Sequence, residues 1–125
     1  MNNDFKLDVV QVRLAKGAPL YSDEKIDGPE TAIKTVGKEL ADMDREVVAV
    51  INCKTNGMPI NVCFASMGTL NKALFSPREI LKSTILSNAA SIVLIHNHPS
   101  GQFTPSREDI RVTGVFEELC GLLNI

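Results

Sequence analysis

Several features that would assign the chain to a class of protein are scarce or missing in its sequence. No apolar stretch approaches the ~20 residues that a membrane-spanning helix needs, so no membrane span is predicted. The N-terminus has no basic segment followed by an apolar one, which argues against a secretory signal peptide. Positive charge is not in excess either. The net charge of −2 and the pI near 5.6 give no strong signal for binding nucleic acid through its phosphates.

Cysteines are few, and their number and spacing are unlike those of a metal or redox pair. The chain has three: Cys53, Cys63 and Cys120. Residues 55–58 (Thr-Asn-Gly-Met) predict a two-residue hairpin loop of type I′, because Asn-Gly tolerates positive φ angles. That register places Cys53 opposite Ile60 and Cys63 opposite Val50, on opposite faces of the hairpin. We therefore expect unpaired, apolar cysteines in a reducing compartment, the cytoplasm.

The remaining composition is that of one folded domain over residues 1–125. The hydrophobic fraction of 44% and the charged fraction of 22% are ordinary for a globular protein with a single core. Periodicity predicts, in order, a strand over 7–14, a helix over 29–43, strands over 46–53 and 59–66, a helix over 76–88, a strand over 92–95 and a helix over 105–123. This order implies an α/β fold, a three-layer-like sandwich with a central mixed β-sheet flanked by helices. The apolar end of the last helix suggests that a further C-terminal strand is missing.

Three local patterns refine this layout. The helix over 29–43 presents one apolar face, formed by Ile33, Val36, Leu40 and Met43. Ser76, Pro77 and Glu79 have the spacing of a capping box at the start of the next helix. The continuous β-branched run over 92–95 predicts a strand that is buried on both faces.

Both histidines of the protein, His96 and His98, stand two positions apart at the end of that run. Side chains at i and i+2 of a strand project to the same face, so the two imidazoles can aim at one point. Asp109, early in the following helix, could bring a carboxylate to the same point. Two imidazoles and one oxygen ligand suit a zinc-type ion, and three protein ligands leave a fourth position for water. We therefore predict a metal site of the catalytic kind.

The residues around these ligands also have structural interpretations. Asp109 could instead belong to the cap of a helix begun by Ser106, since the positive end of the helix dipole favours an acid. The spacing leaves ligation and capping both open. Ser106 is either that cap or a hydroxyl that donates to a developing oxyanion. Asn97 would point to the strand face opposite the histidines, so we assign it a structural hydrogen bond.

A hydrolytic metal site also needs a group that carries the proton of the attacking water. The acids upstream of the histidines are Glu24, Glu30, Glu39, Asp42, Asp44, Glu46 and Glu79. Glu46 is favoured because it begins a strand that should lie beside the strand over 92–98. The acids of residues 39–44 look like a solvated helix end, and the capping box with Ser76 accounts for Glu79.

Residues 96–109 match the JAMM motif, which is His-x-His, seven residues, Ser, two residues and Asp, and the chain thus resembles the JAB/MPN-type metalloproteases. Within this motif, the residues His-Asn-His-Pro-Ser-Gly are similar to those of the RadC-like branch. So are residues 67–70 (Met-Gly-Thr-Leu), 76–79 (Ser-Pro-Arg-Glu) and 88–90 (Asn-Ala-Ala). The resemblance covers residues 20–125 and implies the JAB/MPN fold, which is like that of cytidine deaminases.

The resemblance also implies roles for individual residues. It places Zn²⁺ on His96, His98 and Asp109, with a water as fourth ligand, and it makes Ser106 the oxyanion stabiliser. Glu46 would take the proton of the water and pass it to the leaving amine, while the metal lowers the pKa of that water toward ~7. The implied substrate is an amide bond in a peptide or protein.

We therefore expect a zinc-dependent metallopeptidase or isopeptidase-like hydrolase. The alternative is a catalytically silent, metal-bearing binding module associated with DNA repair or mobile-element processing. A nuclease would show salt-sensitive DNA binding, which the acidic composition disfavours. RadC-like proteins often carry an N-terminal helix-hairpin-helix region, which the sequence lacks. Substrate identity and oligomeric state do not follow from the sequence.

Overall fold

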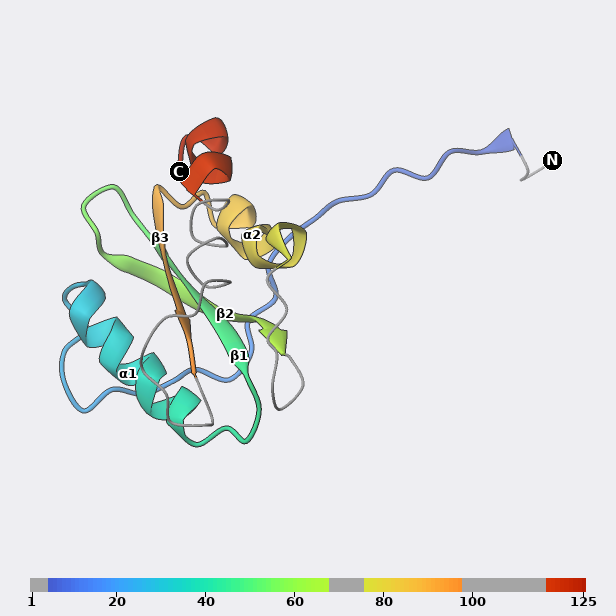
Figure 1. Ribbon diagram of the computed structural model, residues 1–125. Helices are drawn as coiled ribbons and strands as arrows, with labels where there is room; N and C mark the ends of the chain where they lie inside the picture. The colour runs from blue at the N-terminus through green and yellow to red at the C-terminus, as the bar shows by residue number, and fades with distance from the viewer. Residues whose placement is uncertain (1–4, 68–75, 98–116) are drawn as a thin grey trace.

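The computed structural model describes residues 5–67, 76–97 and 117–125. In chain order its elements are α1 (Pro29–Ala41), β1 (Val47–Cys53), β2 (Pro59–Met67), α2 (Pro77–Leu86) and β3 (Ser91–His96), and residues 117–123 are also helical. The strands form a sheet in the order β2-β1-β3. Helix α1 covers one face, and α2 and the helix over 117–123 cover the other (Figure 1). The layered α/β fold is confirmed, although the pairings in the described part are antiparallel, where a mixed sheet was predicted.

The central strand β1 carries the core, and all seven of its residues are buried. Its side chains alternate between two apolar clusters, as a strand covered on both faces requires. Val47, Ala49, Ile51 and Cys53 pack with Ala32, Val36 and Leu40 of α1, whereas Val48 and Val50 pack with Ile80 and Leu81 of α2. The strand over 92–95 was predicted to be buried on both faces, but β3 is only half-buried beyond Ser91, because it is an outer strand of the described sheet.

The β1–β2 hairpin turns through a longer loop than the sequence predicts. The Gly57 N–H donates to the Lys54 carbonyl (2.9 Å), the Lys54 N–H donates to the Met58 carbonyl (2.8 Å), and Gly57 takes a φ of +85°. This is the three-residue loop with a left-handed glycine rather than the predicted type I′ loop. Cys53 therefore pairs with Pro59 instead of Ile60, and an irregularity between Asn52 and Cys53 restores the predicted register.

From Asn52 back to Ala49 the sequence-based register is correct, and a second irregularity between Val48 and Ala49 shifts it by one residue. Cys63 lies opposite Val50, as predicted. Val50 belongs to the α2-side cluster and Cys53 to the α1-side cluster. Since directly opposite residues share a face of the sheet, Cys53 and Cys63 lie on different faces, and both thiols are free.

The predicted strand over residues 7–14 is wrong. These residues form neither helix nor strand, and the segment runs away from the body of the molecule (Figure 1). The side chains of Leu7, Val9, Val10 and Val12 are 72–95% exposed. A strand needs a hydrogen-bonding neighbour as well as alternating apolar residues, and none of the described strands lies beside this segment.

The helices begin where predicted and differ in their details. Helix α1 ends at Ala41 rather than Met43, and its buried face includes Ala32 in place of Ile33. Ser76 precedes α2 at the cap position, but its side chain makes no capping bond, so the capping-box prediction is wrong. Instead, the Lys82 ammonium pairs with the Glu79 carboxylate at 3.1 Å.

The predicted last helix, over 105–123, falls partly outside the described residues, and its described part is helical from 117 to 123. Leu119 packs against the α2-side cluster, as an inward-facing residue should. Leu122 and Leu123, at the apolar end of this helix, are 75% and 45% exposed. No helix in the described part of the chain is long and apolar enough to cross a bilayer.

A buried polar network joins α2 to the centre of the sheet. The Asn52 side chain is fully buried; it donates to Asn61 Oδ1 (2.7 Å) and Ser83 Oγ (3.1 Å) and accepts from Thr84 Oγ1 (2.7 Å). Asn61 continues the network by donating to Ser87 Oγ (2.9 Å). The amide of Asn52 therefore fixes the position of α2 on the sheet through its buried bonds to Ser83 and Thr84, for which water does not compete.

We expect Asn52→Ala to lower the free energy of unfolding by about 2–4 kcal/mol, because Ser83 and Thr84 then lose a buried hydrogen bond and Asn61 loses a half-buried one. Urea denaturation followed by circular dichroism measures the change. Lys54→Ala is the matched control: this side chain is exposed two positions further along the chain, and its loss should cost less than about 0.5 kcal/mol. Equal effects of the two substitutions would contradict a structural role for the network.

Candidate functional site

Glu46 and His96 lie at the same end of the sheet. Strand β1 begins one residue after Glu46, strand β3 ends at His96, and the antiparallel register sets Val48 opposite His96. Val48 packs on the α2 side, so His96 also belongs to that face. Glu46 precedes Val48 by two positions, the spacing that puts side chains on one face of an extended chain. The prediction that the Glu46 strand lies beside the strand that carries the histidines is confirmed.

Both side chains are half-buried. A half-buried carboxylate and imidazole keep contact with solvent, while the strands that begin after Glu46 and end at His96 hold their backbones. The arrangement brings a carboxylate and an imidazole to one end of a rigid element. This is the placement that hydrolytic chemistry requires of a general base and a metal ligand.

Asn97, which follows His96, ties the two chain segments together. Its Oδ1 accepts the Val47 N–H (2.8 Å), and its Nδ2 donates to the carbonyls of Leu40 (3.1 Å) and Arg45 (3.0 Å). The prediction of a structural role for Asn97 is thus confirmed. Its partners were not predicted, because no local pattern links a side chain to backbone groups about fifty positions earlier in the sequence.

The other three predicted site residues, His98, Ser106 and Asp109, lie outside the described residues. Their assignments as two zinc ligands and an oxyanion stabiliser stay predictions. Within residues 5–67, 76–97 and 117–125, no group of three or more His, Cys, Asp or Glu side chains could hold a metal ion. The described half of the site therefore consists of His96 and Glu46.

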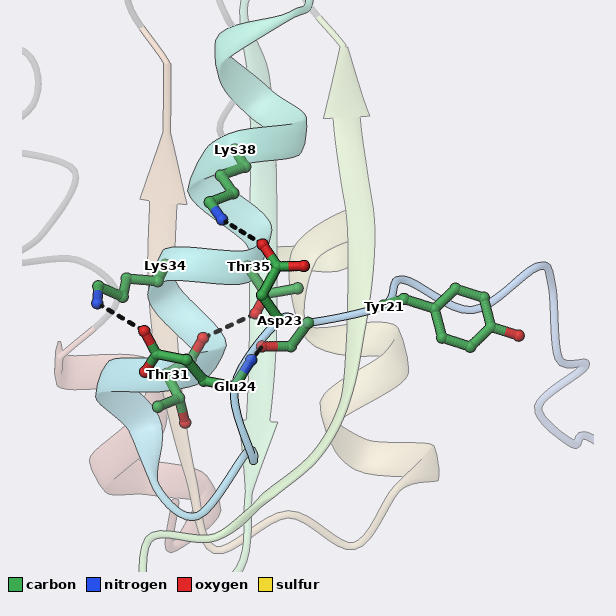
Figure 2. Close-up of a pocket in the computed structure, with 8 residues that line it drawn as sticks. Tyr21, Asp23, Glu24, Thr31, Lys34, Thr35 and Lys38 are labelled. Atoms are coloured by element: carbon green, nitrogen blue, oxygen red, sulfur yellow. Dashed lines mark hydrogen bonds and ion pairs between the residues drawn. The ribbon is translucent and has the colours of Figure 1, made fainter.

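The other upstream acids are all exposed, whereas Glu46 is half-buried, and Glu24 and Glu79 pair with lysines. Figure 2 shows the outer face of α1, where Lys34 reaches Glu24 and Lys38 reaches Asp23, both at 3.2 Å, around a cavity of about 30 Å³. Residues 39, 42 and 44 are exposed, as predicted for a solvated helix end. The two exposed ion pairs, Lys34–Glu24 and Lys38–Asp23, contribute little to stability. They hold the segment that leads into α1 against the helix.

The cysteines are poor candidates for chemistry in this fold. Burial raises the pKa of the Cys53 thiol, against a smaller lowering by its hydrogen bond with Ser91, and burial also raises the pKa of Cys120. Nucleophilic attack and metal binding both use the thiolate. Because a raised pKa keeps these thiols protonated at neutral pH, Cys53 and Cys120 act as apolar side chains, as the sequence predicted.

A larger cavity of about 700 Å³ lies beside α1 and extends to Ser83 of α2. It is bordered by residues 14–20 of the N-terminal segment, by α1 and by β2, and its apolar lining includes Leu20, Val36 and Val62. Neither Glu46 nor His96 lines it. The cavity is therefore separate from the described residues of the candidate site.

Comparison with known proteins agrees with the motif and the fold. A family model described as a RadC-like JAB domain matches residues 26–125. The chain is 36% identical over 106 residues to a UPF0758 protein of Clostridium beijerinckii, covering 85% of this chain and 46% of that protein. It is 45% identical over 86 residues to a UPF0758 protein of Rubrobacter xylanophilus, covering 69% and 38%. A third relative, from Clostridium kluyveri, is 41% identical over 103 residues, covering 82% and 45%. The chain thus spans less than half the length of these relatives.

Proposed function

The chain belongs to the RadC-like JAB domain family, and on that premise we propose that it is a zinc-dependent hydrolase of amide bonds, a metallopeptidase or isopeptidase. The observation that carries the proposal is the pairing of β1 with β3, which brings Glu46 and His96 to one end of the sheet. A ligating imidazole and a proton-accepting carboxylate meet there on rigid backbone.

The donor set suits zinc. His96 supplies an imidazole from the end of β3, and the motif adds His98 and Asp109 in sequence. Two nitrogens and one oxygen leave a fourth position of a tetrahedral ion for water, as in hydrolytic zinc sites. The Cys53 thiol does not compete for the ion, because it lies on the α1 face of the sheet and is buried.

Each residue has a separate part in the proposed reaction. A zinc ion bound by the three ligands would lower the pKa of a water molecule at the site. Glu46 accepts the proton of that water as the water attacks the amide carbon, and then delivers it to the leaving amine. The Ser106 hydroxyl donates a hydrogen bond to the carbonyl oxygen as negative charge develops on it. The substrate is a peptide or protein. The three unpaired cysteines are consistent with a reducing compartment such as the cytoplasm.

We expect the purified protein to hold about one zinc ion per chain and to cleave peptide or isopeptide bonds only in that form. Elemental analysis gives the stoichiometry, and a library of fluorogenic peptides and ubiquitin-like conjugates gives the activity. Removal of zinc by a chelator should abolish cleavage, and added zinc should restore it. A protein that binds no zinc, or that cleaves equally well without it, would contradict the proposal.

A third outcome separates the proposal from its alternative. Stoichiometric zinc without cleavage of any peptide or conjugate, together with saturable binding of a peptide or protein, would favour the silent metal-bearing module.

A further inference from the structure

The side chain of Asn97 makes three hydrogen bonds, and two of its partners flank Glu46. Its Oδ1 accepts the N–H of Val47 (2.8 Å), one residue after Glu46. Its Nδ2 donates to the carbonyl of Arg45 (3.0 Å), one residue before Glu46, and to the carbonyl of Leu40 near the end of α1 (3.1 Å). Both amide protons and the amide oxygen of Asn97 are thus used, so only an asparagine-like group of this length fits the position.

The bonds connect two segments that must keep a fixed distance for hydrolysis to occur. Asn97 is covalently joined to His96, and it grips the backbone on both sides of Glu46. A cap on α1 alone would need only the bond to Leu40, since one donor satisfies one terminal carbonyl of a helix. The bonds to Arg45 and Val47 add nothing to such a cap. They fix the backbone from which the Glu46 side chain projects.

We propose that Asn97 is a positioning residue that holds Glu46 at the end of the strand that carries His96. The proposal rests on the proposed function, in which Glu46 carries protons beside the metal held by His96. Asn97 itself bonds to the backbone of Leu40 in the last turn of α1 and acts through the segment that carries Glu46. Its contribution is to keep the carboxylate within reach of the water, a distance to which turnover is sensitive at the scale of about 1 Å.

Asn97→Asp is the sharpest test, because it changes only the donor half of the amide. The aspartate can still accept the Val47 N–H but cannot donate to the carbonyls of Arg45 and Leu40, and its charge repels them. We expect kcat, counted per zinc-loaded chain, to fall between about tenfold and a hundredfold while KM changes by less than about threefold. Counting zinc-loaded chains removes the effect of partial unfolding, so a merely structural role would leave this kcat unchanged.

Amide hydrogen exchange supplies a readout that does not depend on activity. Asn97→Ala removes the acceptor of the Val47 N–H, so exchange at Val47 should speed up by at least about tenfold, while exchange at Ile51 in the centre of β1 stays the same. Asn56→Asp is the matched control. Asn56 uses only its oxygen, which accepts the Met58 N–H (3.0 Å) and which aspartate retains, so neither exchange nor kcat should change.

The outcomes separate this proposal from the one on which it rests. Unchanged exchange at Val47 in Asn97→Ala, or unchanged kcat in Asn97→Asp, would overturn the positioning role even if the wild-type protein is an active zinc hydrolase. A wild-type protein without hydrolysis would contradict the proposed function, and with it the role of Asn97 in turnover. The exchange data would then still establish whether Asn97 holds the Glu46 segment.

Discussion

Glu46→Gln is expected to lower the kcat for peptide hydrolysis by at least about a hundredfold while the protein keeps about one zinc ion per chain. Glutamine has the size of glutamate and can still accept a hydrogen bond, but it cannot take up the proton of the attacking water. General base catalysis accounts for about 10²–10⁴-fold in rate where it operates. The imidazole of His96 is untouched by the substitution, so the metal content separates loss of chemistry from loss of the site.

Turnover measured with fluorogenic peptides, with zinc content determined on the same sample, tests this expectation. Glu39→Gln is the matched control, because Glu39 is exposed in the last turn of α1 and undergoes the same chemical change. It should leave kcat within about twofold of the wild-type value. Full activity of Glu46→Gln would show that another group carries the proton, and loss of zinc would show that Glu46 is a ligand.

The two strands that meet at the candidate site could be predicted because each has a local sequence pattern typical of a strand. Residues 46–53 and 92–95 both read as strands, and the turn at Asn56-Gly57 forces the first of them into a hairpin. The sequence does not predict which of these two strands is covered on both faces. A continuous apolar run occurs in both strands, and only the sheet order β2-β1-β3 makes β1 the strand covered on both faces.

The failed predictions share one physical cause: a local sequence pattern permits a structure, but the residues that surround it in the fold determine whether that structure forms. Residues 7–14 alternate like a strand, yet a strand also requires a hydrogen-bonding edge. Ser76 and Glu79 have the spacing of a capping box, yet Lys82, one helical turn beyond Glu79, offers its carboxylate a cation. The hairpin loop gained a residue because Gly57 alone supplies the positive φ that a three-residue loop needs.

The placement of Glu46 and His96 on neighbouring strands was predictable, and the bonds that tie the two segments together were not. The His-x-His spacing identified His96, and the expectation that neighbouring strands meet identified Glu46 without any contact being visible in the sequence. The hydrogen bonds of Asn97 to the residues around Glu46 span about fifty positions, and no local rule reports a contact of that separation. These bonds are nevertheless what gives Glu46 a fixed place relative to His96.

His96→Ala is expected to weaken zinc binding by more than about a hundredfold, since loss of a partner that only orients a ligand already costs about 10–100-fold. His96 lies in the last position of β3, held by its pairing with Val48. Removal of the imidazole should leave the sheet intact, because the backbone bonds of the strand do not involve the side chain. Zinc affinity is measured by competition with a chromophoric chelator, and folding by circular dichroism.

The matched control for this experiment is Cys63→Ala, which removes a half-buried thiol that could in principle bind zinc from the neighbouring strand β2. We expect this variant to keep the wild-type affinity, because Cys63 lies opposite Val50 in the middle of the sheet, away from the end where His96 and Glu46 meet. If His96→Ala bound zinc as tightly as the wild-type protein, the imidazole at the end of β3 would not be a ligand. That result would contradict the proposal that Glu46 works beside a metal ion held by His96.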